Sequence, residues 1–124
     1  MLKVNAFHIC ENLIIEDGTQ KVSLIGIFEN INAQNFPAVY PQVTIFAAFE
    51  GDKPGPYEIE LKLSDKEGEI LKTSTKIAIG ENLRGNWFTK IPIFQIRGES
   101  TIEIILSVSN KVIHTGYITV NNKK

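Results

Sequence analysis

Apolar and polar residues alternate strictly along several short segments of this chain. Residues 58–63 read Glu-Ile-Glu-Leu-Lys-Leu, and residues 101–108 repeat the pattern. Because successive side chains of a β-strand point to opposite faces, each segment has one apolar and one polar face. Half-buried antiparallel strands are typical of such patterns. No window of ten or more residues has helical spacing, so the sequence predicts an all-β fold.

Turn-forming residues separate the alternating segments. Asp17-Gly18 divides two apolar runs, and both residues tolerate the positive φ that tight hairpins need. Residues 65–68 and 109–111 have the same role, and the two prolines of the 51–56 loop cannot donate to a β-ladder. The pattern predicts strands at residues 2–10, 12–16, 21–30, 43–50, 57–64, 69–79, 86–95 and 101–120, the last region being two strands joined by a turn. The total is eight if residues 2–16 form one bent strand and nine if that segment is broken.

Short strands with intervening turns are typical of a β-sandwich or a barrel. The clear polar face of several strands favours an antiparallel two-sheet β-sandwich of about eight strands. A length of 124 residues suits one domain covering residues 1–124, and no linker divides it. Residues 22–28 differ, because they are apolar on both faces. They predict a central strand whose second face is covered, by the crossover at residues 32–40.

Composition narrows the compartment and the partners. The chain has one cysteine, so an internal disulfide is impossible, and its N-terminus lacks a signal-peptide pattern. No apolar run reaches the eighteen or so residues of a membrane span. The net charge is −1 with mixed signs, whereas nucleic-acid binding needs clustered Lys and Arg. We therefore expect a cytoplasmic protein that binds neither nucleic acid nor membrane.

Seven short segments carry a family resemblance: Cys10-Glu11, Asp17-Gly18, Ser23-Leu24-Ile25-Gly26-Ile27-Phe28, Phe36-Pro37, Tyr40-Pro41, Gly55-Pro56-Tyr57 and the Asp65…Gly68 turn. Together they resemble a family of small, uncharacterised bacterial proteins known only as a domain of unknown function. Members often have Asp where this chain has Glu11 and Asn30, and His where it has Tyr40. The resemblance implies an Ig-like sandwich in a bacterial cytoplasm. It brings no known catalytic residues, and a fold alone does not give function.

His8 and Cys10 are the first candidates for chemistry. Two residues apart on a strand, they share a face and could bind zinc with His114 as a third ligand. Structural zinc sites need four ligands, and a thiol in the core is the simpler interpretation. Glu11 beside the cysteine disfavours a reactive thiolate, and no nucleophile-elbow, Walker or Rossmann motif is present. We expect no catalytic residues, no metal and no cofactor.

Two connections supply a candidate interaction surface, formed by Phe36, Tyr40, Arg84 and Trp87. Phe36 and Tyr40 each precede a proline, which stiffens the connection and favours a cis peptide bond. The preferred alternative is that these two rings cap the open end or second face of the sandwich. Trp and Arg are common at interface hot spots, but Trp87 could equally fill the core. It points outward if Phe88 and Phe94 point inward.

These features predict a non-enzymatic protein that acts through protein–protein contacts, with a homodimer as one form. Exposed sheet edges would also allow strand pairing, unless charges such as Lys72 and Lys76 guard them. Two alternatives stay open. One is a sugar- or small-ligand-binding module in which Trp87 stacks on the ligand. The other is a metal or thiol enzyme built on the two histidines and the cysteine.

Overall fold

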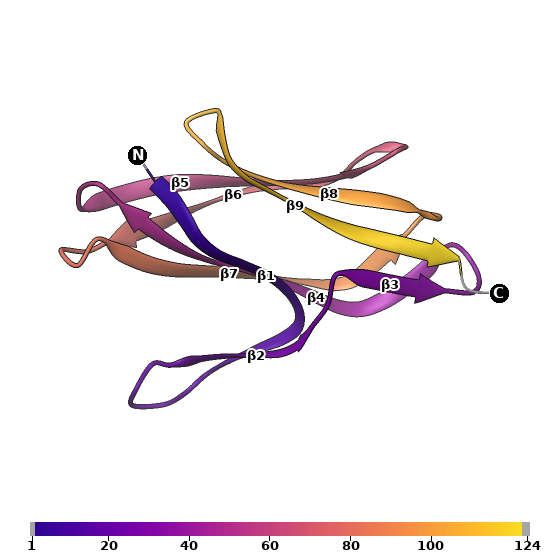
Figure 1. Cartoon of the computed structure of the whole chain (residues 1–124), viewed down its shortest axis with the longest axis horizontal. Coiled ribbons are helices and arrows are strands. Elements are labelled where there is room, and N and C mark those ends of the chain that lie inside the picture. Colours follow the sequence, from indigo (N-terminus) through magenta and orange to yellow (C-terminus); the bar gives the residue numbers. More distant parts are fainter. Residues whose placement is uncertain (1, 123–124) are drawn as a thin grey trace.

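The computed structural model describes residues 2–122, and these form nine β-strands in two stacked layers (Figure 1). The strands are β1 Leu2–Ile15, β2 Val22–Ile27, β3 Asn30–Ala33, β4 Ala38–Gly51, β5 Gly55–Asp65, β6 Gly68–Ile79, β7 Arg84–Ile96, β8 Ser100–Val108 and β9 Lys111–Asn122. The all-β, two-sheet prediction is confirmed. The strand count rises from about eight because the predicted 32–40 crossover begins inside a short additional strand, β3. Within residues 2–122 there is no helix that could span a membrane.

One sheet has the strand order β2-β1-β4-β7 and the other has the order β3-β9-β8-β5-β6. Every neighbouring pair is antiparallel except β3 and β9, which run parallel. The expectation of a wholly antiparallel arrangement is therefore wrong at this pair. After β2 the chain crosses to the other sheet, where the Thr119 amide donates to the Glu29 carbonyl at 2.9 Å. The crossover places β3 beside β9 in the same direction.

Alternating side chains of both sheets fill the space between the layers. The apolar positions of β5 (Ile59, Leu61 and Leu63) are fully buried, as the period-two pattern predicts. The corresponding positions of β8 are buried as well. Burying one such side chain stabilises the fold by about 1.5–3 kcal/mol. The alternating sequence therefore predicts which side chains of β5 and β8 lie in the core.

Strand β7 changes its inward face at Ile93. This residue has φ of 50°, which is rare for a β-branched side chain and re-phases the strand. Trp87 on one side of it is 7% exposed and Phe94 on the other is 2% exposed, although their positions differ in parity. The outward position of Trp87 was conditional on Phe88 and Phe94 both pointing inward, and this condition is not met because Phe88 is exposed. Trp87 is a core residue, and its neighbour Phe88 is partly exposed.

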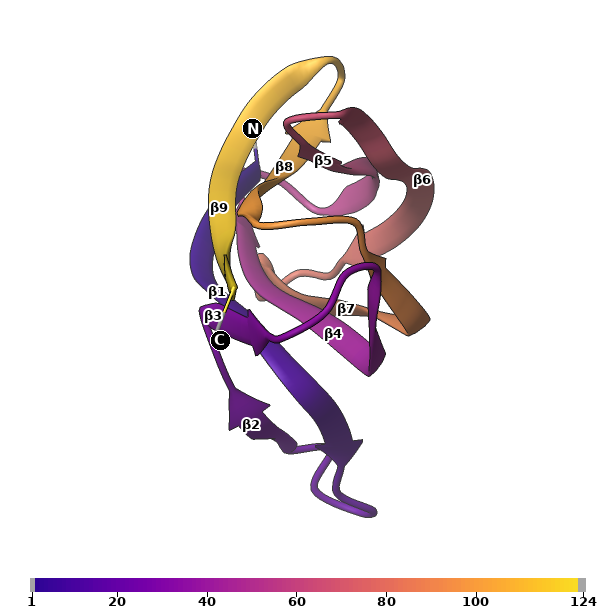
Figure 2. The ribbon, with the colours of Figure 1, turned by 90° about the vertical axis from the view of Figure 1, so that its right-hand side faces the viewer.

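Strand β2 lies at the edge of its sheet rather than at the centre. It forms a hairpin with the last residues of β1, and this hairpin projects away from the two layers (Figures 1 and 2). The prediction of a central, covered strand at residues 22–28 is therefore wrong. Strand β2 is therefore an edge strand with apolar residues on both faces, and the exposure of these residues needs a separate explanation.

The two layers touch along both long sides. On one side β6 contacts β7, and on the other β1 contacts β9. On the second side, here called the seam, the ring of Phe7 packs on Gly116. A Cβ atom at Gly116 would lie 2.5 Å from Cε2 of Phe7. The seam thus depends on a side chain that fits over a glycine.

Candidate functional site

Phe36 and Tyr40 lie at one end of β4. Both are half-buried and pack against the core, and Tyr40 stacks on Phe28 with ring centroids 5.2 Å apart. The Phe36–Pro37 peptide bond is cis, one of the two aromatic-proline bonds at which the sequence favours that form. Burial, followed by the nearby charge of Glu11, raises the pKa of the Tyr40 hydroxyl. The two rings thus pack on the core, in keeping with the alternative preferred from the sequence, in which they cap one end of the fold.

Arg84 and Trp87 lie towards the opposite end of β4. Arg84 stands opposite Glu50, with its Nε 3.9 Å from the carboxylate, whereas Tyr40 stands opposite Phe94. Ten residues of strand separate Tyr40 from Glu50, which corresponds to about 33 Å. The four residues of the candidate surface therefore do not come together, and Trp87 is not available on the outside.

The structure brings His8 and His114 to the lining of one pocket, and Cys10 is not among the residues that line it. Cys10 is fully buried, its Sγ donates to the Asn12 carbonyl at 3.3 Å, and burial raises the pKa of its thiol. His8 is exposed, whereas His114 is half-buried with its ring 4.5 Å from that of Phe7. Among residues 2–122, no group of three or more His, Cys, Asp or Glu side chains is arranged to hold a metal ion.

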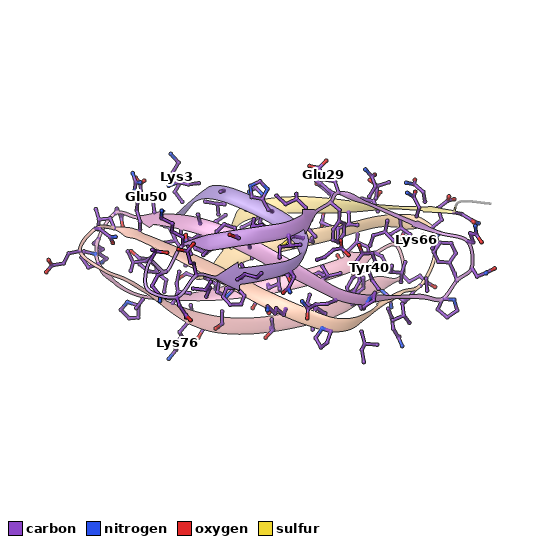
Figure 3. The ribbon with its side chains drawn as sticks, turned by 90° about the horizontal axis from the view of Figure 1, so that it is seen from below. Lys3, Glu29, Tyr40, Glu50, Lys66 and Lys76 are labelled. Carbon is purple, nitrogen blue, oxygen red and sulfur yellow. The ribbon has the colours of Figure 1, made fainter. Side chains whose placement is uncertain are left out.

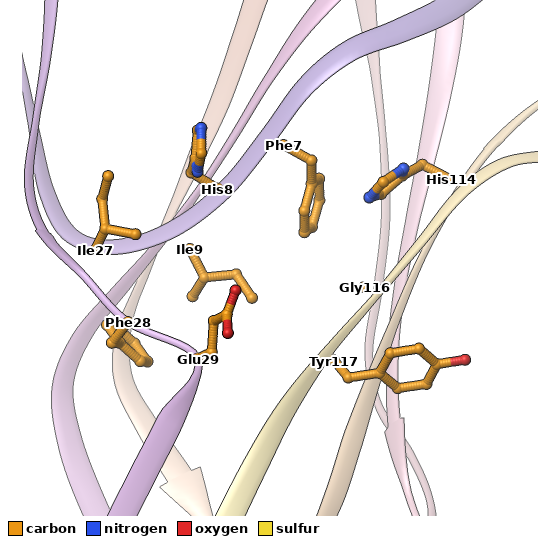
Figure 4. Close-up of a pocket in the computed structure, with 9 residues that line it drawn as sticks. All are labelled: Phe7, His8, Ile9, Ile27, Phe28, Glu29, His114, Gly116 and Tyr117. Atoms are coloured by element: carbon orange, nitrogen blue, oxygen red, sulfur yellow. The ribbon is translucent and has the colours of Figure 1, made fainter.

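A pocket of about 230 Å³ opens at the seam, between β1, the β2–β3 connection and β9 (Figure 4). Figure 4 shows Phe7 between the imidazoles of His8 and His114, with the Glu29 carboxylate on the far wall. Burial lowers the pKa of His114 and so favours the neutral form of its ring. Ligand pockets for drug-sized molecules usually measure about 300–1,000 Å³. The pocket is small and shallow by that standard.

The projecting hairpin carries the most distinctive surface of the molecule. Four isoleucines on it are 45–55% exposed: Ile14, Ile15, Ile25 and Ile27. Together with the free edge of β2 they are called the hairpin surface below. Strand β2 itself reads Val-Ser-Leu-Ile-Gly-Ile, without a charge or a proline.

Local contacts explain why the hairpin bends away from the sheet. The carbonyl of Glu11 accepts hydrogen bonds from the side chains of Gln42 and Thr44, at 3.1 and 3.3 Å. Opposite Glu11, Gly26 has φ of 68°, and a Cβ atom there would lie 2.5 Å from the Glu11 carboxylate. The positive φ favours glycine at this position of the hairpin. The predicted turn at Asp17-Gly18 is confirmed, since Gly18 has φ of 85°.

The other sheet edges differ chemically from that of β2. Strand β6 carries Lys72 and Lys76, and β7 carries Lys90 and Pro92. Charges and prolines of this kind block unwanted strand pairing. Lys76 points outward on the outline of the molecule (Figure 3). Strand β3 offers only four residues, so β2 is the longest edge without such protection among the described residues.

Sequence reasoning missed the hairpin surface although its signal was present. Residues 22–28 are apolar on both faces, and this pattern predicts a covered central strand. A projecting two-stranded hairpin has the same pattern, and only the order of the strands in the sheet distinguishes it from a covered central strand. That order is a property of the whole fold.

One solved structure is similar in fold, and a second gives a weaker match. The alkylpurine DNA glycosylase AlkC of Pseudomonas fluorescens, bound to DNA containing an abasic site analog, matches with a TM-score of 0.60 at 7% identity, over 97% of this chain and 30% of that chain. A putative beta-galactosidase from Bacteroides fragilis matches with a TM-score of 0.46 at 13% identity, over 74% of this chain and 17% of that chain. These identities indicate similarity of fold alone, and this chain spans less than a third of either protein.

Comparison with curated protein sequences gives no significant match. A family model, by contrast, covers nearly the whole chain and confirms the resemblance inferred from the short segments. With residues 5–121 matching that model, the chain belongs to DUF6941, a family of unknown function.

Proposed function

We propose that this chain is a non-enzymatic, Ig-like module of the bacterial cytoplasm that acts through protein–protein contacts made by the hairpin surface. The observation that carries this proposal is the unprotected edge of β2, flanked by four exposed isoleucines. Apolar residues gathered in one exposed patch mark interaction sites, whereas scattered ones need no explanation. A free strand edge also orients the partner, because an extended segment can pair with it through backbone hydrogen bonds.

The size of the patch indicates a weak contact. Covering a half-exposed isoleucine contributes about 1 kcal/mol, which is half of the value for full burial. Association costs about 4 kcal/mol or more in lost translational and rotational freedom. Because the adjacent residues Ile14 and Ile15 point to opposite faces of the hairpin, one partner surface covers at most three of the isoleucines, which offset most of that cost, and the backbone hydrogen bonds of the edge supply the remainder. We therefore expect a reversible complex.

The alternatives lack comparable support. A sugar-binding module was expected to use Trp87 as its stacking platform, but this side chain is buried in the core. A thiol enzyme needs an accessible thiolate, whereas Cys10 is buried and its pKa is raised. The seam pocket remains too small to favour a second function.

The proposal is tested by capturing the tagged protein from its own cells in three forms. These are the wild type, an Ile25→Lys/Ile27→Lys variant, and a Val112→Lys control that changes an exposed apolar residue on β9. We expect the wild type and the control to recover the same proteins, this chain itself included, and the hairpin variant to lose them. Circular dichroism should show that all three are folded. Equal recovery by all three forms would contradict the proposal.

A further inference from the structure

We propose that the seam pocket holds one arginine side chain of the partner protein. This inference rests on the proposed function and deepens it, because Ile27 belongs both to the hairpin surface and to the lining of the pocket. A partner that covers this end of the hairpin surface can therefore place one side chain in the pocket. The pocket gives the contact a chemical preference that the isoleucines alone do not supply.

Glu29 is the acidic residue of the pocket, and its carboxylate lacks a counter-charge. The residue is exposed, and none of the ion pairs formed within residues 2–122 includes it. Figure 4 shows the carboxylate turned in among the lining side chains, near Ile9. The backbone on both sides of it is fixed: the Phe28 amide donates to the Ile9 carbonyl at 2.9 Å. The Glu29 carbonyl itself accepts from the Thr119 amide at the same distance.

Two backbone carbonyls add acceptors to the pocket. Along a regular β-strand, the N–H and C=O groups of every second residue point to the same side. The Ile9 carbonyl faces β2, so that of Phe7, two residues earlier in a regular part of β1, also points away from β4 and towards the seam. The Thr119 amide faces the chain before β3, so the groups of Tyr117 on β9 point to that same side. Both residues line the pocket.

These groups favour a cation as the occupant. An apolar group would desolvate the Glu29 carboxylate without giving it a partner, which is unfavourable, and an acidic group would meet a like charge. Burial lowers the pKa of His114, and its neutral ring offers one more accepting nitrogen. A guanidinium carries five donors and no acceptor, and it packs on aromatic rings such as those of Phe7 and Phe28 better than an ammonium does. Arginine therefore fits the pocket better than lysine.

The volume of the pocket suits one side chain. A dry cavity of about 150 Å³ holds a benzene molecule, whereas pockets for drug-sized ligands begin near 300 Å³. The seam pocket, at about 230 Å³, lies between these sizes. A metal ion is excluded as the occupant, because the described part of the chain holds no group of three or more suitable ligands.

The test is an NMR titration of the full 124-residue, isotope-labelled chain with N-acetyl-arginine methylamide. We expect saturable shifts of the backbone amides of Phe7, Glu29 and Tyr117, with a dissociation constant in the millimolar range. N-acetyl-citrulline methylamide has a similar shape without the charge and should leave these amides unshifted. Glu29→Gln should weaken binding of the arginine compound about fivefold, which is the effect of losing a well-formed exposed ion pair. The matched control Glu58→Gln changes an exposed carboxylate on β5 and should bind like the wild type.

Capture from cells then tests whether the arginine belongs to the partner protein. Glu29→Gln is expected to recover less of the captured proteins than the wild type and Glu58→Gln do, with circular dichroism confirming that all three are folded. The inference is overturned by the absence of saturable shifts, by equal shifts with the citrulline compound, by unchanged binding to Glu29→Gln, or by equal capture with all three forms. In each of these cases, loss of the captured proteins from the Ile25→Lys/Ile27→Lys variant would still support the proposed function.

Discussion

The packing of Phe7 on Gly116 at the seam gives a quantitative prediction. Replacing Gly116 by Ala puts a Cβ atom 2.5 Å from Cε2 of the ring, so the ring must move. Overpacking of this kind usually costs about 1–3 kcal/mol. Ala is favoured over Gly within a strand by about 0.5–1 kcal/mol, which offsets part of that cost. We expect Gly116→Ala to lower the free energy of unfolding by about 1–2 kcal/mol.

The measurement is urea unfolding of four proteins: wild type, Gly116→Ala, Phe7→Leu and the double variant. Phe7→Leu removes part of a half-buried ring and should cost about 1 kcal/mol by itself. Since the smaller side chain makes room for the new methyl group, the double variant should be more stable than the sum predicts, by about 0.5 kcal/mol or more. Gly98→Ala is the control, because nothing lies within 4 Å of its added Cβ. Strict additivity in the cycle would refute the packing argument.

Four further predictions concern single residues. Trp87→Ala should cost about 3–5 kcal/mol in the free energy of unfolding, because a core side chain is lost, and thermal denaturation would show it. Burial raises the pKa of Asp65, but the hydrogen bonds from Arg97, at 2.6 and 3.0 Å, together with the Glu67 amide and the charge of Arg97, lower it overall. The paired carboxylate therefore stabilises the fold above the unfolded pKa of about 3.9, and this contribution is lost as the pH falls through the lower folded pKa. Arg97→Met should thus weaken the fold at pH 7 and flatten the loss of stability in acid titrations followed by circular dichroism. Because burial lowers the pKa of His114 below its unfolded value of about 6.5, the wild type should lose stability relative to His114→Gln as the pH falls from 7 to 5, in urea titrations at each pH. The Cys10 thiol should react with a thiol reagent only in denaturant, and rapid reaction of the native protein would contradict its burial.

Local alternation was sufficient to predict most strands and much of the core. The buried positions Ile59 to Leu63 of β5 and Ile102 to Leu106 of β8 follow directly from the period of two, because the ladder irregularities lie after Leu63 and Leu106. Strand β3 could not be predicted in this way. Its four residues are too few for a pattern, and its partner β9 lies nearly ninety residues later: the Asn32–Asn121 side-chain hydrogen bond spans 89 positions.

The candidate surface failed for a related reason. Strand parity gives the face of a residue only while the strand is regular, and Ile93 interrupts β7 between Trp87 and Phe94. The distance between Tyr40 and Arg84 depends on the register of β4 with β7. No single segment of sequence specifies that register. Residue types and turns could therefore be predicted locally, whereas the assembly of a surface could not.

The parallel pairing of β3 with β9 has a consequence for the order in which the molecule folds. The four strands of the first sheet are complete once residue 96 has been synthesised, whereas the second sheet needs β9 to bridge β8 and β3. Contacts between distant parts of a chain are slow to form, since closing long loops costs entropy. During translation the strands of the first sheet, β2 included, are therefore available for pairing before the second sheet can be completed by β9.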